Sequence, residues 1–121
     1  MAKILVADDN EDFLELMCDV LENDDHDVVT AKNGREAIKL LDQGVSYDLV
    51  ITDLLMPDID GIGVIQFVNK MNKKPPIIAL SGGGVTINSN DILKVVEDSV
   101  QVVLQKPIAI TTLIEKVNMY I

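Results

Sequence analysis

The stretch Leu49-Val50-Ile51-Thr52-Asp53 is an apolar, β-branched run that ends in a carboxylate. A second apolar run of this kind lies near the N-terminus and ends in two acids: Lys3-Ile4-Leu5-Val6-Ala7-Asp8-Asp9. Continuous apolar runs of this length are typical of strands that are covered on both faces, as in a parallel sheet flanked by helices. The two stretches therefore predict parallel strands that deliver acidic side chains to one end of a sheet.

Five such runs alternate with helical patterns along the chain. Strands are expected at Lys3–Ala7, Asp27–Thr30, Leu49–Thr52, Pro76–Leu80 and Gln101–Leu104. The segments between and after them repeat apolar residues every three or four positions, as amphipathic helices do. These apolar stripes are Phe13, Leu14, Met17, Val20 and Leu21; Ala37, Ile38 and Leu41; Val64, Ile65 and Val68; Ile92, Leu93 and Val96; and Leu113, Val117 and Tyr120 or Ile121.

Two helix starts have the spacing of a capping box, in which a polar residue is followed three positions later by a glutamate. They are Asn33 with Glu36, and Thr112 with Glu115. Strands and helices that alternate five times predict a single α/β domain over residues 1–121, with a doubly wound, five-stranded parallel sheet. The strand order 2-1-3-4-5 is one of the two common solutions for such a sheet.

Charge and composition exclude several classes of function. Twenty acidic residues stand against ten basic ones, and Arg35 is the only arginine. Direct binding to nucleic acid or to an anionic membrane is not expected, because phosphate contacts need Lys and Arg. No apolar run approaches the roughly 18 residues that span a membrane, and the N-terminus reaches acids too early for a secretory signal. The single cysteine, Cys18, lies among apolar helical positions, so we expect a core thiol and a cytoplasmic protein.

Polar residues follow four of the five strands. Asp8 and Asp9 follow the first strand, Asp53 the third, Ser81 the fourth and Lys106 the fifth. In a doubly wound sheet, the functional crevice lies outside the carboxyl ends of the strands, so these side chains are expected to meet there.

The predicted cluster has a definite chemistry. Two carboxylates about 4 Å apart repel by roughly 4 kcal/mol at an effective dielectric constant near 20, so the cluster needs a cation. Mg²⁺, held by one or two carboxylates, waters and a phosphate oxygen, fits that need. A carboxylate beside Mg²⁺, a lysine and a hydroxyl is a plausible acceptor for a phosphoryl group.

Four motifs carry a resemblance to a known family. They are Asp8-Asp9, then Asp53-Leu54-Leu55-Met56-Pro57-Asp58-Ile59-Asp60-Gly61, then Ala79-Leu80-Ser81-Gly82, and finally Lys106-Pro107. In this order, each after its expected strand, they resemble the receiver domains of response regulators in two-component signalling, including the chemotaxis receivers. The resemblance covers the whole chain and implies a flavodoxin-like fold.

The resemblance also implies a role for each matching residue. Asp53 matches the phosphoacceptor. Asp8 and Asp9 match the pair that organises Mg²⁺, Asp9 as the more direct ligand and Asp8 largely through water, and the backbone carbonyl of Leu55 matches a further metal ligand. Ser81 matches the hydroxyl that bonds the phosphoryl group after transfer, and Lys106 pairs with that group.

Further implications concern the bond after Lys106 and the partners. The Lys106–Pro107 bond is expected to be cis. The implied partners are a histidine kinase or histidine phosphotransfer protein, which donates the phosphoryl group, and an output partner. That output partner would read the face made by the fourth helix, the fifth strand and the fifth helix. The domain would promote its own phosphorylation and dephosphorylation without being an enzyme for another substrate.

The sequence departs from the family pattern in three places. Val103 stands where such domains usually carry Tyr or Phe, so a ring that swings on activation is excluded. Three glycines, Gly82-Gly83-Gly84, follow Ser81 and add backbone freedom. Leu55 and Gly83 offer no polar side chain to orient an attacking water. We therefore expect activation to be read out through ordering of the loop Gly82–Asn88.

Other interpretations fit parts of the pattern. Acids after a strand can be helix caps or a solvated first turn. A hydrolase of the haloacid-dehalogenase type would need a second acid at the position of Leu55. A flavin-binding protein would need a phosphate-binding loop in place of Asp8-Asp9, and more than four aromatic residues. A pseudo-receiver that takes no phosphate is opposed by the intact Asp53, Asp9 and Lys106.

Overall fold

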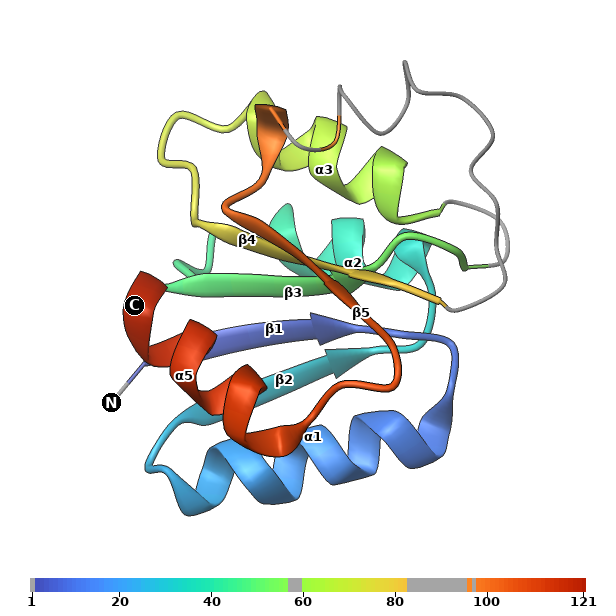
Figure 1. The fold of residues 1–121 in the computed structure, drawn as a ribbon. Coiled ribbons are helices and arrows are strands. Elements are labelled where there is room, and N and C mark those ends of the chain that lie inside the picture. Colours follow the sequence, from blue (N-terminus) through green and yellow to red (C-terminus); the bar gives the residue numbers. More distant parts are fainter. Residues whose placement is uncertain (1, 57–59, 83–95, 97) are drawn as a thin grey trace.

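The chain folds into a five-stranded parallel sheet with helices on both faces (Figure 1). The computed structural model describes residues 2–56, 60–82, 96 and 98–121. The sheet order is β2-β1-β3-β4-β5, which confirms the predicted order 2-1-3-4-5. In chain order the elements are β1 (Lys3–Ala7), α1 (Glu11–Asn23), β2 (Asp27–Ala31), α2 (Gly34–Leu41), β3 (Leu49–Asp53), α3 (Gly61–Asn69), β4 (Ile77–Ser81), β5 (Val102–Gln105) and α5 (Ile110–Tyr120).

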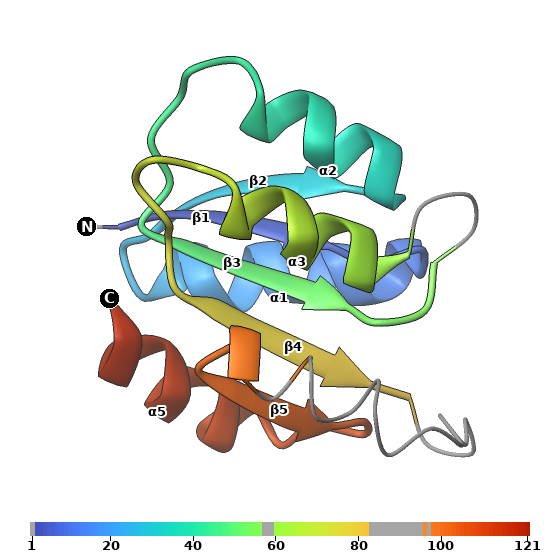
Figure 2. The ribbon, with the colours of Figure 1, turned by 90° about the horizontal axis from the view of Figure 1, so that it is seen from above.

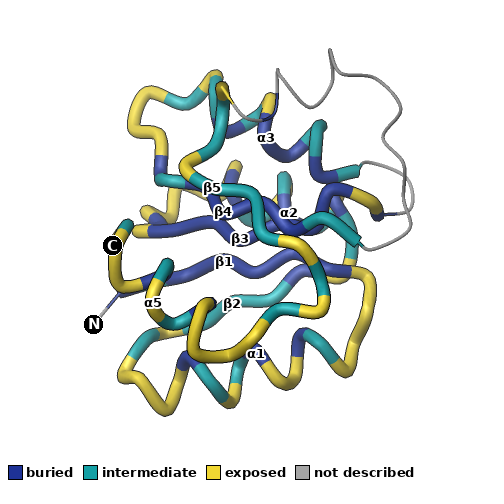
Figure 3. Tube along the Cα trace, viewed as in Figure 1, coloured by how far each residue is buried: buried dark blue, intermediate teal, exposed yellow. Residues whose placement is uncertain are grey.

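Two apolar cores lie on opposite faces of the sheet, because successive strand residues point to opposite sides. Figure 2 shows α2 and α3 on one face and α1 and α5 on the other. On β3, Val50 belongs to the core under α2 and α3, whereas Ile51 belongs to the core under α1 and α5. The central strands β1, β3 and β4 are almost entirely buried, and the edge strands are less so (Figure 3). Burial on both faces explains their continuous apolar sequences.

Four strands end one residue later than predicted. β2 ends at Ala31, β3 at Asp53, β4 at Ser81 and β5 at Gln105, and the last two also begin one residue later. The backbone ladder continues past the apolar run, since the amide of Leu54 donates to the carbonyl of Leu80 at 2.9 Å. Asp53 and Ser81 are therefore part of the sheet itself, and the sheet fixes their backbone positions.

The helix starts confirm one predicted cap and correct the other. Asn33 caps α2, since its side chain accepts a hydrogen bond from the Glu36 amide at 2.7 Å. Thr112 caps nothing. α5 begins two residues earlier, at Ile110, after Ala109, whose carbonyl accepts the Leu113 amide, so Thr112 lies inside the first turn.

Cys18 is only half-buried, which corrects the expectation of a core thiol. It lies on α1 between the buried Met17 and the exposed Asp19, so its side chain is turned partly out of the core. Burial, followed by the charges of Glu22, Asp19 and Glu15, raises the pKa of the thiol.

The predicted fourth helix falls mostly outside the described residues. Val96 is helical and buried, and Asp98 and Ser99 are helical, whereas Ile92 and Leu93 are not described. The loop predicted to order on activation also lies outside the described residues, apart from Gly82. Among the helices that the structure describes, none has the length and hydrophobicity to cross a membrane.

Candidate functional site

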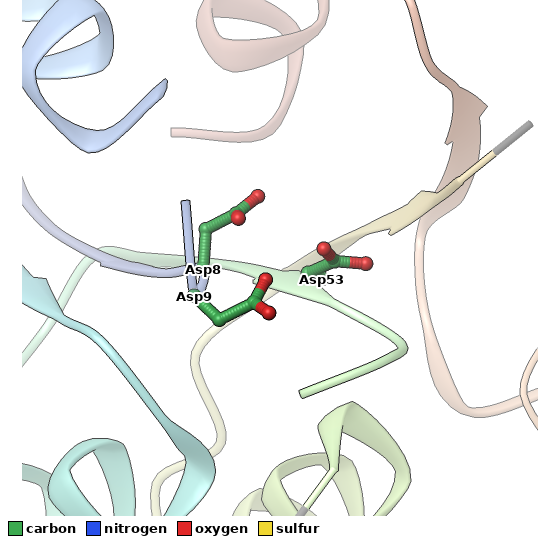
Figure 4. A group of neighbouring side chains, drawn as sticks. All are labelled: Asp8, Asp9 and Asp53. Atoms are coloured by element: carbon green, nitrogen blue, oxygen red, sulfur yellow. The ribbon is translucent and has the colours of Figure 1, made fainter. Parts of the chain in front are cut away.

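Three carboxylates meet at the carboxyl ends of β1 and β3 (Figure 4). Asp8, Asp9 and Asp53 each place a carboxylate oxygen within 4.8 Å of the others. Asp8 is fully buried and Asp53 nearly so, while Asp9 is exposed. The central position of β1 and β3 in the sheet is the reason these residues meet, since the two strands pair with Ala7 opposite Thr52.

Lys106 brings a positive charge to the two buried acids. Its Nζ lies 2.5 Å from Oδ2 of Asp8 and 3.2 Å from Oδ2 of Asp53. The lysine follows β5, whose ladder with β4 extends one step further, since the Lys106 amide donates to the Ser81 carbonyl at 2.8 Å. The Lys106–Pro107 bond is cis, as predicted.

The electrostatics of the cluster favour an additional cation. Burial raises the pKa of Asp8, with the charge of Asp53 adding to it, against the hydrogen bonds from Lys106 and the Asn10 amide. For Lys106, burial lowers the pKa, but the hydrogen bond to Asp8 and the charges of both acids outweigh it, so the net shift is upward. The lysine stays an ammonium ion at neutral pH, and it contacts two of the three carboxyl groups. Closely spaced carboxylate oxygens are the donors that a hard divalent ion takes, so the residues fit a site for Mg²⁺.

Backbone and glycine contacts hold Asp53 in place. The Leu55 amide donates to Oδ1 of Asp53 at 3.2 Å, and the Thr52 hydroxyl donates to the Asp53 carbonyl at 3.0 Å. Gly61, the first residue of α3, lies directly against this backbone. A Cβ at Gly61 would stand 2.0 Å from the Asp53 carbonyl oxygen. The turn from β3 to α3 thus needs glycine because the two backbones approach too closely for any side chain.

The remaining predicted residues lie at or near this edge. Ser81 ends β4, one strand from Asp53, and is half-buried. Leu55 follows β3 with an exposed side chain, and its amide donates to Asp53, while the role of its carbonyl as a metal ligand stays a prediction. Val103 lies in β5 opposite Ala79 and packs against the core under α2 and α3.

Two residues of the cluster were not predicted from the sequence. Asn10 donates its amide to Oδ1 of Asp8 at 2.9 Å, and its side chain caps α1 by accepting the Phe13 amide at 3.1 Å. The Nζ of Lys106 lies 4.5 Å from the centre of the Phe13 ring. The spacing of Asn10 before the helical stripe was a detectable cap signal. For Phe13 no local signal exists, since the sequence shows only one more apolar position of α1.

Comparison with known proteins places this chain in one family. The family model of the response regulator receiver domain matches residues 4–118. The chain belongs to that family and is a signalling domain of two-component systems. This membership decides against the hydrolase and the flavin protein considered from the sequence.

Individual relatives show how far the likeness extends. The receiver domain of a Francisella response regulator is 32% identical, with a TM-score of 0.84 over 99% of this chain and 96% of that one. The Thermotoga maritima response regulator TrrA, solved in complex with Mg²⁺ and BeF, is 32% identical with a TM-score of 0.84 over the full length of both chains.

One of the curated relatives is much longer than this chain. The CpxR homolog of Haemophilus influenzae, a transcriptional regulatory protein, is 33% identical over 100 residues, which are 77% of this chain and 43% of that protein. The chain thus spans less than half the length of this relative.

Proposed function

We propose that Asp53 accepts a phosphoryl group from a phosphohistidine of a histidine kinase or a histidine phosphotransfer protein. The observation that carries this proposal is the position of Asp53, a nearly buried carboxylate at a strand end, within reach of Lys106 and of two further acids. A carboxylate oxygen of Asp53 attacks phosphorus and forms an acyl phosphate. The bond from phosphorus to the donor nitrogen breaks, and the nitrogen keeps its electron pair.

The surrounding residues would stabilise the charge on the phosphoryl oxygens. Asp8, Asp9, Asp53 and the Leu55 carbonyl would hold Mg²⁺, which supplies positive charge next to those oxygens when bound. Lys106 already lies 3.2 Å from Asp53 and would pair with the phosphoryl group, while the Ser81 hydroxyl would bond it after transfer. Catalysis of this kind is positioning plus electrostatic stabilisation, so the domain can promote its own phosphorylation and dephosphorylation.

The output of the domain follows from the same proposal. Phosphorylation would bias two conformations, and a partner or attached output domain would bind one of them better. With Val103 in place of an aromatic residue, the loop Gly82–Asn88 and the face made by the fourth helix, β5 and α5 remain the predicted readout. The proposed function implies a cytoplasmic location, because histidine kinases present their phosphohistidine there.

The direct test is the Asp53→Asn variant, incubated with Mg²⁺ and a small phosphodonor such as acetyl phosphate. The wild-type chain should gain the mass of one phosphoryl group, and the variant should gain none, because the amide cannot form an acyl phosphate. Asp42→Asn is the matched control, since this exposed acid at the end of α2 carries the same charge away from the cluster. Equal labelling of Asp53→Asn and the wild type would contradict the assignment.

A further inference from the structure

Phe13 makes an aromatic contact with the lysine of the site. Its ring centre lies 4.5 Å from the Nζ of Lys106, and the side chain is half-buried on α1, where it packs against the core under α1 and α5. An ammonium within about 6 Å of a ring face is attracted by the negative face of the aromatic system. Phe13 is thus a third partner of Lys106, beside Asp8 and Asp53.

The contact closes a ring of interactions around Asp8. The Asn10 amide donates to one oxygen of Asp8, and the Asn10 side chain accepts the Phe13 amide. The Phe13 ring faces Lys106, whose Nζ donates to the other oxygen of Asp8. These contacts connect the first turn of α1 to both oxygens of Asp8, to one through Asn10 and to the other through Lys106. They keep the Phe13 ring next to the Lys106 ammonium.

The aromatic contact differs in kind from the two ion pairs. The carboxylates of Asp8 and Asp53 would be shared with a metal ion or a phosphoryl group during the reaction, so their hold on the lysine changes. The ring carries no net charge and takes no part in those exchanges. It lies against the ammonium on the side of α1, while the lysine side chain stays 23% exposed.

We propose that Phe13 is a positioning residue, which holds the Lys106 ammonium over Asp53 for phosphoryl transfer. This inference rests on the proposed function, since it assigns Phe13 a part in the same reaction. The ring does not touch the reacting atoms and acts through the lysine alone. A purely structural role, as one more apolar side chain under α1, would need only hydrophobic volume and not an aromatic face.

The test separates the aromatic face from apolar volume. Phe13→Leu keeps an apolar side chain of similar size, and Phe13→Tyr keeps the ring. Phe67→Leu is the matched control, because Phe67 is the only other phenylalanine and packs half-buried on α3, on the opposite face of the sheet. The measurement is the rate constant for phosphorylation by acetyl phosphate at saturating Mg²⁺.

Phe13→Leu should lower this rate constant roughly threefold to tenfold, within the range of a partly desolvated cation–π contact. Phe13→Tyr and Phe67→Leu should stay within about twofold of the wild type. In a Lys106→Met background, Phe13→Leu should have no further effect, since the ring acts through the lysine. Equal rates for Phe13→Leu and Phe13→Tyr would overturn the inference.

A second measurement does not depend on activity. The unfolding equilibrium constant is measured in urea without metal for Phe13→Leu, Lys106→Met and the double variant. The factor by which the double variant changes this constant should be smaller than the product of the two single-variant factors, by about twofold to thirtyfold. Multiplicative effects would mean that the two side chains do not interact, and the inference would fail. A wild-type chain that takes up no phosphoryl group would instead contradict the proposed function, and the coupling in urea would still report the contact.

Discussion

The two ends of the sheet carry the same three kinds of side chain in different surroundings. At the carboxyl end, Lys106 lies 2.5 Å from Asp8 and 3.2 Å from Asp53, and its Nζ is 4.5 Å from the centre of the Phe13 ring. The side chain of Asp8 is 0% exposed and that of Asp53 9% exposed.

At the amino end, Lys3 of β1 has an acid and an aromatic ring as its neighbours. Its Nζ lies 3.9 Å from Asp27, whose side chain is 61% exposed, and 5.9 Å from the centre of the Tyr47 ring. An exposed ion pair contributes about 0–1 kcal/mol, whereas breaking a buried one costs about 3–5 kcal/mol. The acids that pair with a lysine are thus buried at the carboxyl end of the sheet and exposed at the amino end.

The largest difference between the two ends of the sheet should appear in the phosphorylation rate when Lys106 or Lys3 is replaced. Lys106→Met should lower the rate of Asp53 phosphorylation by about 10²–10³-fold, the usual effect of losing one group that stabilises developing charge. Lys3→Met should leave that rate unchanged, because Lys3 lies at the other end of β1. Rates of acyl-phosphate formation for the two variants and the wild type provide the measurement. A loss of less than tenfold in Lys106→Met would remove the lysine from the proposed chemistry.

The next contrast concerns two glycines. Gly61→Ala should destabilise the fold by about 3 kcal/mol, because its Cβ would meet the Asp53 backbone at 2.0 Å and neither backbone can move freely. Gly44, in the loop before β3, has φ +78° and nothing within 4 Å of an added Cβ, so Gly44→Ala should cost only about 1 kcal/mol, for the left-handed backbone. Urea unfolding of both variants measures the difference, and equal losses would contradict the close approach at Gly61.

The two glycines illustrate which features of the fold and of the site can be predicted from the sequence. The alternation of apolar runs and helical stripes predicted a doubly wound parallel sheet, for which 2-1-3-4-5 is one of two common strand orders. The residues that end the strands predicted Asp8, Asp9, Asp53, Ser81 and Lys106 as one cluster, because parallel strands share one end. In the sequence, Gly61 stands only as the last residue of the motif that begins at Asp53. Its contact with Asp53 depends on the packing of α3 against β3, and the Phe13–Lys106 contact depends on two elements at opposite ends of the chain. Neither leaves a local pattern.

Added Mg²⁺ should stabilise the folded chain by binding at the carboxyl end of the sheet, and not at the amino end. At 100 times its Kd, a ligand that binds only the folded state adds about 2.7 kcal/mol to the free energy of unfolding. Asp9→Asn should reduce this gain and raise the stability of the metal-free protein, since it removes one of three mutually repelling acids. Asp42→Asn should keep the full gain. Melting curves with and without Mg²⁺ test this prediction. A wild-type melting temperature that does not change with Mg²⁺ would exclude a metal site at the carboxyl end of the sheet.

Alkaline pH should act through Tyr47 at the amino end. Burial, with a smaller contribution from the charge of Asp27, raises the pKa of Tyr47 above its ordinary value of 10.0. The folded state therefore holds the phenolic proton more tightly than the unfolded state. The resulting stability is fully present below pH 10 and is lost as the pH rises through the folded-state pKa. Tyr47→Phe should lack this loss, so the stability of the variant relative to the wild type should increase above pH 10. Parallel pH dependences of the two proteins would contradict this prediction.

The smallest effect is expected for the stability of Lys3→Met. The ion pair of Lys3 with Asp27 spans 3.9 Å between two partly exposed side chains, and the ring of Tyr47 lies at the outer limit of a cation–π contact. Water and salt screen such a pair, so the free energy of unfolding should change by no more than about 0.5 kcal/mol. Urea unfolding at low and at high salt measures it, and the small difference from the wild type should shrink further as salt is added. A loss of more than about 1.5 kcal/mol would mean that Lys3 is more tightly held than its exposure indicates, and the contrast between the two ends of the sheet would no longer rest on burial.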